Sequence, residues 1–171
     1  GAAGTVGPFA VQLAKYFGAE VTGVDSAEKL EMLRSIGADR VIDYTRLDFT
    51  KCDETYDLIL DVVGRSSFSG SIRSLKKNGC YLIPNPRLTV RARRASRTGG
   101  REVVFGAAHP RTEDLVFLKQ LIEDGKLRSV IGRRYPLEQT AEAHRYVETG
   151  HKTGQVVIQV QQRSKRAGVS S

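Results

Sequence analysis

The sequence predicts an α/β fold with a doubly wound parallel sheet (Rossmann-like), truncated at its N-terminus and lacking the first strand. Short apolar runs alternate with segments of helical periodicity along the chain, a pattern typical of parallel strands joined by helices. A glycine-rich turn, Gly1-Ala2-Ala3-Gly4-Thr5-Val6-Gly7, opens the chain directly before a helical segment. The strand expected ahead of this turn and an initiator Met are both missing. We therefore expect the chain to be the C-terminal piece of a longer protein.

Each element has its own local signal. Apolar residues recur at three- and four-residue spacing from about Thr5 to Phe17, which predicts a helix that ends at Gly18. Ser26 is expected to cap a second helix that stops at Gly37, and Thr112 to cap a later helix that stops at Gly125. The buried face of that later helix is expected to hold Leu115, Leu118, Leu121 and Ile122. Further helices are expected at 66–77 and 138–149, a turn at 78–79, and strands at 21–25, 41–43, 56–63, 80–83, 102–106 and 155–160.

Length and composition favour one globular domain. The chain has 171 residues, of which 40% are hydrophobic and 27% charged, which suffices for a sizeable core. No apolar run approaches the roughly 20 residues needed to cross a bilayer, so no membrane partner is expected. Cys52 and Cys80 stand apart from any metal-binding spacing, which favours two free thiols in a reducing, cytoplasmic compartment.

The net charge of +8 is concentrated in two segments. Residues 87–101 hold six arginines and no acid, and the tail 161–171 holds three cations and no acid. Charge runs of this kind are usually solvated loops or tails. We therefore expect a domain over residues 1–160 and a basic disordered tail over 161–171. Nucleic acid is an unlikely partner, although an RNA-binding module that uses both basic segments stays open as an alternative.

The opening turn carries a relaxed dinucleotide-binding pattern, Ala2-x-Gly4-x-x-Gly7. Small residues let a diphosphate approach the backbone, and the N–H groups and dipole of the following helix favour its negative charge. A strand follows the helix and ends at Asp25, 21 residues after Gly4, close to the roughly 20 expected for a carboxylate that binds a ribose 2′-hydroxyl. The alternative is an ordinary βα turn in which Asp25 belongs to a helix start.

Longer segments strengthen this interpretation. The chain contains GAAGTVGPFAVQLAKYFGAEVTGVDSAEKLEMLRSIGADRVIDYT, YDLILDVVG, EDLVFLKQLIEDGKL and YPLEQTAEAHRYVETGHKTGQVVIQV. Over about residues 1–160 these resemble the C-terminal cofactor domain of the medium-chain dehydrogenase/reductase family. The quinone oxidoreductase-like branch, also called zeta-crystallin-like, is the most similar.

The resemblance implies a function. Members of this branch bind NADPH, and sometimes NADH, between this domain and an N-terminal GroES-like domain. They transfer hydride to a small-molecule quinone, enone or carbonyl substrate, usually without zinc. By resemblance we expect the missing GroES-like domain as a partner, and a possible homodimer formed through residues 101–107. Without the missing half, the chain alone is not expected to be active.

The resemblance also assigns cofactor-binding residues. The pyrophosphate would be lined by Ala2, Gly4, Thr5, Val6 and Gly7. The adenosine 2′-phosphate would be held by Ser26 and Lys29, with Tyr44 packed nearby. The nicotinamide side would be bordered by Val63, Phe105, Gly106 and Ala107.

Two residues make opposite demands on the coenzyme. Asp25 would repel a 2′-phosphate and favour NAD, whereas Lys29 would favour NADP through a charge-assisted hydrogen bond. The resemblance favours NADPH, and NAD stays possible. The alternative for Lys29 is plain solvation on a helix surface.

No catalytic residue is assigned. His109, His144 and His151 are the three histidines of the chain, and none has an orienting partner visible in the sequence. The proton donor is expected in the missing domain or in water, and no metal site is expected in this part. A Rossmann-like methyltransferase would fit the glycine turn but not the closing segment.

Overall fold

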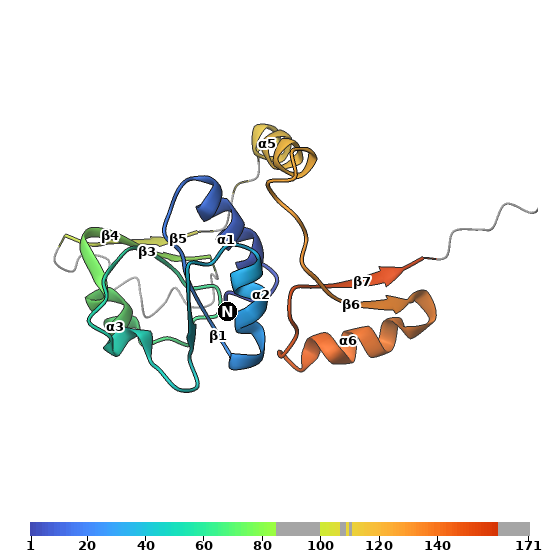
Figure 1. Cartoon of the computed structure of the whole chain (residues 1–171), viewed down its shortest axis with the longest axis horizontal. Helices are drawn as coiled ribbons and strands as arrows, with labels where there is room; N and C mark the ends of the chain where they lie inside the picture. Colours follow the sequence, from blue (N-terminus) through green and yellow to red (C-terminus); the bar gives the residue numbers. More distant parts are fainter. Residues whose placement is uncertain (85–99, 107–108, 110, 161–171) are drawn as a thin grey trace, which may run out of the picture. The chain divides into compact units, whose positions relative to one another are not determined.

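The computed structural model describes residues 1–84, 100–106, 109 and 111–160. The chain forms two compact units, the first over residues 1–128 and the second from residue 129 onward (Figure 1). That the two units together form the single domain expected over residues 1–160 stays a prediction. The basic stretch up to residue 99, the tail 161–171 and the predicted site residue Ala107 lie outside the described residues.

The first unit alternates strands and helices in the predicted order. Its elements are α1 (Gly7–Tyr16), β1 (Thr22–Asp25), α2 (Leu30–Ser35), β2 (Arg40–Asp43), β3 (Tyr56–Leu60), α3 (Phe68–Arg73), β4 (Leu75–Ile83), β5 (Glu102–Phe105) and α5 (Thr112–Glu123). Short 3-10 turns span Ala27–Lys29 and Phe49–Lys51. The second unit is β6 (Ile131–Pro136), a 3-10 turn (Leu137–Gln139), α6 (Thr140–Glu148) and β7 (Gln155–Gln159).

The described strands pair in parallel, which confirms the predicted fold class. β1 pairs with β2, β3 and β5 flank β4, and β6 pairs with β7. Within each sheet the carboxyl ends of the strands therefore lie at one edge; Asp25, for example, stands opposite Asp43. Ligands of open α/β sheets bind at this edge.

Helix ends follow the glycines named from the sequence. Gly18 (φ 81°) follows α1, and Gly125 (φ 67°) follows α5. A side chain at such a φ is strained, so glycine is the residue that lets the chain turn away.

Two expectations in the middle of the chain were wrong. The strand expected over 56–63 ends at Leu60, because the next residues turn around the side chain of Asp61. The helix expected over 66–77 ends at Arg73, and the expected turn at 78–79 lies inside β4. Asn78 has a φ of 66° there, and the pairing of β3 with β4 shifts its register.

The expectations for two helix starts and one helix face also needed correction. Ser26 stands before the first turn, but its hydroxyl donates to the Glu28 carboxylate instead of accepting a backbone N–H. Thr112 is the first residue of α5, whose cap position is Arg111. Leu121 is buried as expected and Leu118 is partly buried, whereas Leu115 and Ile122 are exposed.

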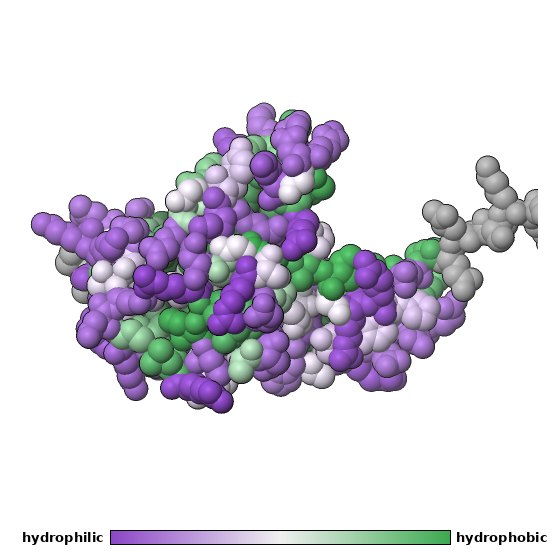
Figure 2. Space-filling view, viewed as in Figure 1, coloured by the Kyte–Doolittle hydropathy of each residue, from purple (hydrophilic) through white to green (hydrophobic). Residues whose placement is uncertain are grey.

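The core of the first unit lies where helices cover the strands. Ile72, Leu75, Tyr81 and Ile83 form a buried cluster between α3 and β4, with Phe105 of β5 packed against it. Apolar residues also reach the surface, as the green areas of Figure 2 show. Among the exposed ones are Val6 and Val63, which flank the opening turn. In the described residues, no helix is long and apolar enough to span a membrane.

Candidate coenzyme site

The opening turn lies at the carboxyl end of β1. The N–H groups of Gly1 and Ala2 both donate to the Val24 carbonyl at 3.1 Å, and Gly4 N–H closes the turn on the Gly1 carbonyl at 3.3 Å. Helix α1 starts immediately afterwards, at Gly7. In α1, Pro8 has no N–H and the N–H groups of Phe9 and Ala10 donate to the Val6 carbonyl, so the N–H of Gly7 is the first-turn donor left for a ligand. The turn therefore presents backbone donors and the positive end of a helix dipole at one place.

Glycine is required at one end of this turn and leaves space at another. A Cβ on Gly7 would collide with the backbone of Ala2, which cannot move out of the way as a flexible side chain would. A Cβ on Gly4 would meet the Gly1 carbonyl oxygen at an ordinary 3.5 Å. The tight packing at Gly7 and the open approach to Gly4 together fit a phosphate that rests against the backbone.

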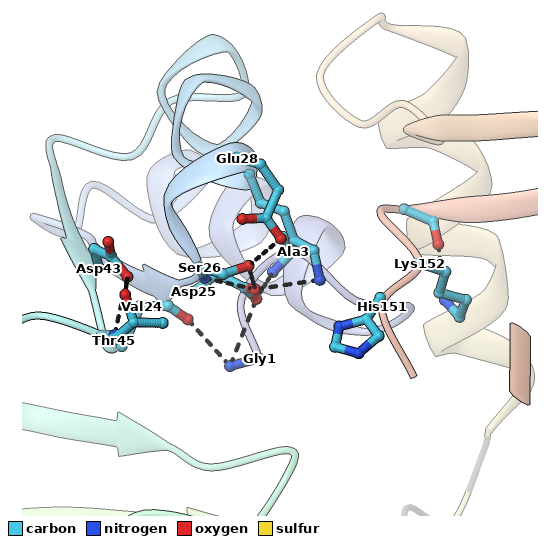
Figure 3. Close-up of polar contacts among 12 residues, drawn as sticks. Gly1, Ala3, Val24, Asp25, Ser26, Glu28, Asp43, Thr45, His151 and Lys152 are labelled. Atoms are coloured by element: carbon cyan, nitrogen blue, oxygen red, sulfur yellow. Dashed lines mark hydrogen bonds and ion pairs between the residues drawn. The ribbon is translucent and has the colours of Figure 1, made fainter. Parts of the chain in front are cut away.

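Asp25 holds the turn through its carboxylate, which lies between Ala3, Ser26 and Gly1 (Figure 3). Its Oδ2 accepts the Ala3 N–H at 2.9 Å, and its Oδ1 accepts the Ser26 N–H at 3.0 Å. Lys29 Nζ lies 3.5 Å from Oδ1, and the Gly1 amino group lies 3.7 Å from Oδ2. Asp25 is only 5% exposed. Both carboxylate oxygens are thus used inside the chain.

The charge of Asp25 is stabilised by these contacts. Burial alone opposes the charge and is the largest single influence on the pKa of the carboxyl group. The N–H groups of Ala3 and Ser26, together with the Lys29 ammonium group nearby, lower the pKa below its usual value despite burial. Asp25 is therefore ionised at neutral pH. Its role as a ribose ligand stays a prediction, whereas its described contacts fix the turn.

Lys29 is 7% exposed, so the alternative of a solvated surface lysine is wrong. Its ammonium group is held beside Asp25, one helical turn away. Ser26 donates from its hydroxyl to Glu28 Oε1 at 2.6 Å. Sequence reasoning missed Glu28, although an acid two residues after a serine that starts a helix is a visible signal. The predicted 2′-phosphate residues thus lie side by side, with an acid among them.

Tyr44 is brought to the same edge of the sheet. Its N–H donates to the Asp25 carbonyl at 3.2 Å, and its side chain is exposed. The neighbouring turn is fixed by Asp43, whose Oδ1 accepts from both the N–H and the hydroxyl of Thr45 (Figure 3). Tyr44 therefore stands next to Ser26 at the ends of two paired strands.

The other predicted residues lie at the carboxyl ends of β3 and β5. Val63 follows β3 and packs on Gly1, since a Cβ built on Gly1 would collide with its side chain. Phe105 ends β5 and packs on the core, and Gly106 N–H donates to the Ile83 carbonyl at 3.5 Å. Val63 thus adjoins the opening turn, whereas Phe105 and Gly106 lie at the carboxyl end of β5 in the sheet of β3, β4 and β5. Ala107 lies outside the described residues.

The histidines and acids of the described residues form no metal-binding group of three or more His, Cys, Asp or Glu side chains. His109, His144 and His151 are all exposed. Sequence reasoning also overlooked Asp61 and Tyr81. The Tyr81 hydroxyl donates to the Asp61 carboxylate, which also accepts the N–H of Val63. An acid at the end of an apolar strand, three residues before a glycine, is the signal that could have pointed to Asp61.

Comparisons with known proteins point to one family. The family model described as zinc-binding dehydrogenase matches residues 36–158. A mitochondrial NAD(P)H oxidoreductase of Mus musculus is 35% identical over 94% of this chain and 46% of its own length. A chloroplastic NADPH-dependent alkenal/one oxidoreductase of Arabidopsis thaliana is 32% identical over 91% of this chain and 38% of its own.

A solved structure gives the same result. The quinone oxidoreductase from Coxiella burnetii superposes with a TM-score of 0.84 at 31% identity, covering 94% of this chain and 51% of that one. The chain therefore spans about half, or less, of the length of the relatives it matches.

Proposed function

Because this chain belongs to the medium-chain dehydrogenase/reductase family, we propose that it is the coenzyme-binding part of an NAD(P)H-dependent oxidoreductase. Its substrate is a quinone, an enone or another carbonyl compound, and it works without zinc. The observation that carries the proposal is the opening turn, held by Asp25 at the start of α1.

The turn binds the diphosphate of the coenzyme. The N–H of Gly7, at the positive end of the α1 dipole, supplies a donor, and the small residues Ala2, Gly4 and Gly7 leave room for the diphosphate. Thr5 and Val6 border them at the surface. Asp25 keeps this arrangement preformed by holding the Ala3 N–H. A preformed site binds with a smaller loss of conformational entropy than a flexible one.

NADPH is the coenzyme we favour, with NADH as the other candidate. Asp25 points at Ala3, and its charge is balanced by Lys29, so its repulsion of a 2′-phosphate is weaker than the sequence suggested. Ser26 and Tyr44 border the same place. Glu28 opposes this choice, because its carboxylate lies against the Ser26 hydroxyl.

The chemistry is divided between coenzyme and chain. The bound coenzyme supplies the hydride that reduces the substrate. The residues of this chain orient the reacting face: Val63 behind the ribose, and Phe105, Gly106 and Ala107 beside the nicotinamide. Such positioning raises the rate by holding the reacting atoms close together. The proton donor belongs to the rest of the protein or to water.

The remaining assignments complete the proposal. A GroES-like N-terminal domain closes the substrate site, and a homodimer forms through residues 101–107. Cytoplasmic location is proposed from the free thiols of Cys52 and Cys80; relatives named above are mitochondrial or chloroplastic. An RNA-binding function is not favoured, because the similarity covers more than nine-tenths of the chain.

Titration of the full-length natural protein with NADPH tests the proposal. We expect quenching or enhancement of the nicotinamide fluorescence with a Kd of about micromolar order, and oxidation of NADPH when a quinone or enone is added. A protein that binds neither NADPH nor NADH contradicts the proposal. Salt-sensitive RNA binding that is lost when residues 87–101 are deleted would favour the alternative.

A further inference from the structure

Asp61 is the centre of a second hydrogen-bond network, which the assigned coenzyme residues do not include. It is the first residue after β3. Its Oδ1 accepts the N–H groups of Val63 at 3.1 Å and Gly64 at 2.6 Å. Its Oδ2 accepts the hydroxyls of Ser66 at 2.6 Å and Tyr81 at 2.7 Å. One carboxylate thus binds two amides and one hydroxyl of its own loop, together with the Tyr81 hydroxyl of β4.

Packing and hydrogen bonds fix the side chains of the two hydroxyl donors, Tyr81 and Ser66. Tyr81 lies in the middle strand of its sheet, is 2% exposed, and belongs to the buried cluster between α3 and β4. The Phe68 ring packs on it at 5.6 Å between centroids. Ser66 also lies 3.3 Å from both the Tyr81 hydroxyl and the Ser71 hydroxyl. Because Tyr81 is fixed in the core, its hydrogen bond to Asp61 fixes the loop after β3 relative to the core.

The network is charged at neutral pH. Burial opposes the charge of Asp61 most strongly, but the four donors together lower the pKa of its carboxyl group below the usual value. Burial and the nearby carboxylate raise the pKa of Tyr81 to about 12. Tyr81 thus stays a protonated donor and Asp61 a charged acceptor, a pairing stronger than one between neutral groups.

The loop that Asp61 holds is the one that touches the opening turn. A Cβ built on Gly1 would collide with Val63 and would come within 3.1 Å of Val62 Cγ2. Gly64 has a φ of 72°, so the chain turns sharply away directly after this contact. The position of Val63 against Gly1 is therefore set by the amides bonded to Asp61.

We propose that Asp61 and Tyr81 are positioning residues for the nicotinamide half of the coenzyme, acting through Val63. This inference rests on the proposed function, which places Val63 at the nicotinamide-side ribose. The network holds this side of the opening turn, while Asp25 holds the other side. Loosening it weakens contacts to the nicotinamide half and leaves contacts to the adenosine half intact.

Two ligands separate these halves in the full-length natural protein. NADPH has both, whereas adenosine 2′,5′-bisphosphate lacks the nicotinamide half. For Tyr81→Phe, the loss of one hydrogen bond to a charged group should raise the Kd of NADPH by about tenfold. The Kd of adenosine 2′,5′-bisphosphate should stay within about twofold of the wild-type value.

Tyr56→Phe is the matched control. The Tyr56 hydroxyl also donates to a carboxylate, Glu54 Oε2 at 3.1 Å, but at the opposite end of β3. Tyr56→Phe should leave both affinities unchanged, and it should lower thermal stability less than Tyr81→Phe, because the Tyr56–Glu54 bond is exposed. If Tyr81→Phe does not fold, Ser66→Ala removes the other hydroxyl donor of the same network from a partly buried position and decides the question.

The outcomes are distinct. Selective loss of NADPH affinity in the network variants supports the inference. Equal loss for both ligands, or no loss for either, overturns it and leaves Asp61 and Tyr81 as purely structural residues. A wild-type protein that binds neither ligand, nor NADH, contradicts the proposed function itself.

Discussion

The Asp25 carboxylate accepts the backbone N–H of Ala3 at 2.9 Å across 22 positions of the chain, in a place almost closed to solvent. This bond joins the end of β1 to the middle of the opening turn. A carboxylate expected to face a ligand is thus directed at the chain that would hold the ligand. Asp25 therefore contributes to the site mainly by fixing the backbone conformation of the opening turn.

Substitution of the two glycines of the turn should separate folding from binding. Gly7→Ala drives a methyl group into the Ala2 backbone and should cost about 1–3 kcal/mol of stability, as overpacking does. Gly4→Ala meets only ordinary contacts, so the free energy of unfolding should barely change. The Gly4→Ala methyl group stands where the diphosphate approaches, so NADPH affinity should still fall. Urea unfolding and coenzyme titration measure the two effects. A Gly4→Ala protein that binds NADPH as tightly as the wild type would place the diphosphate elsewhere.

Asp25 and Lys29 should behave as a coupled pair. Asp25→Asn leaves the Lys29 ammonium buried without its partner and should cost about 3 kcal/mol. Lys29→Met should cost less, because Asp25 keeps the N–H groups of Ala3 and Ser26. The double variant should be more stable than the sum of the single effects predicts, as measured by urea unfolding. Strict additivity would show that the pair does not interact.

Lys29 should also discriminate between the two coenzymes. Lys29→Met should raise the Kd of NADPH by about tenfold and that of NADH by less than about twofold, since a charge-assisted bond to the 2′-phosphate is lost. Lys51→Met, which changes a highly exposed lysine in a different turn, is the control and should alter neither Kd. An equal change for both coenzymes would make Lys29 a structural residue only.

Acid should destabilise the protein through Asp61. Its pKa is lower in the folded chain than the value of about 3.9 expected in the unfolded chain. The stability this difference contributes is present above the unfolded pKa and is lost as the pH falls through the folded pKa. Between about pH 5 and pH 3, the free energy of unfolding should therefore drop more steeply for the wild type than for Asp61→Asn.

Asp57→Asn serves as the control for the acid series. Asp57 lies on β3 as well, but its carboxylate is 82% exposed and pairs with Lys76 at the surface, and such pairs contribute little. Its acid profile should match that of the wild type. If the free energy of unfolding of Asp61→Asn fell with pH as steeply as that of the wild type, Asp61 would make no net favourable contacts in the folded chain.

Periodicity and glycine placement made most of the fold predictable. The apolar residues that predict α1 do not form its buried face, since the residues buried along it are Gly7, Pro8, Val11 and Gln12. The helix itself, the strand that ends at Asp25 and the stops at Gly18 and Gly125 were confirmed. These features depend on neighbours in the sequence, so local patterns carry them.

Features that depend on distant partners were not predictable in this way. The strand at residue 56 ends early because Asp61 binds the amides of Val63 and Gly64, and its other partner, Tyr81, comes from the next strand. The apolar run from residue 56 to 63 does not show at which residue the strand ends. Likewise, the sequence placed Asp25 at the site but could not show that its carboxylate faces Ala3, since this orientation depends on how the turn folds back over β1.

A crystal structure of the full-length natural protein with NADPH bound tests the central claim most directly. We expect the diphosphate within hydrogen-bond distance of the backbone N–H groups between Gly4 and Gly7. The hydrogen bond from Ala3 N–H to Asp25 should be intact in the same structure. A coenzyme bound away from this turn, or a turn rearranged so that Asp25 releases Ala3, would contradict it.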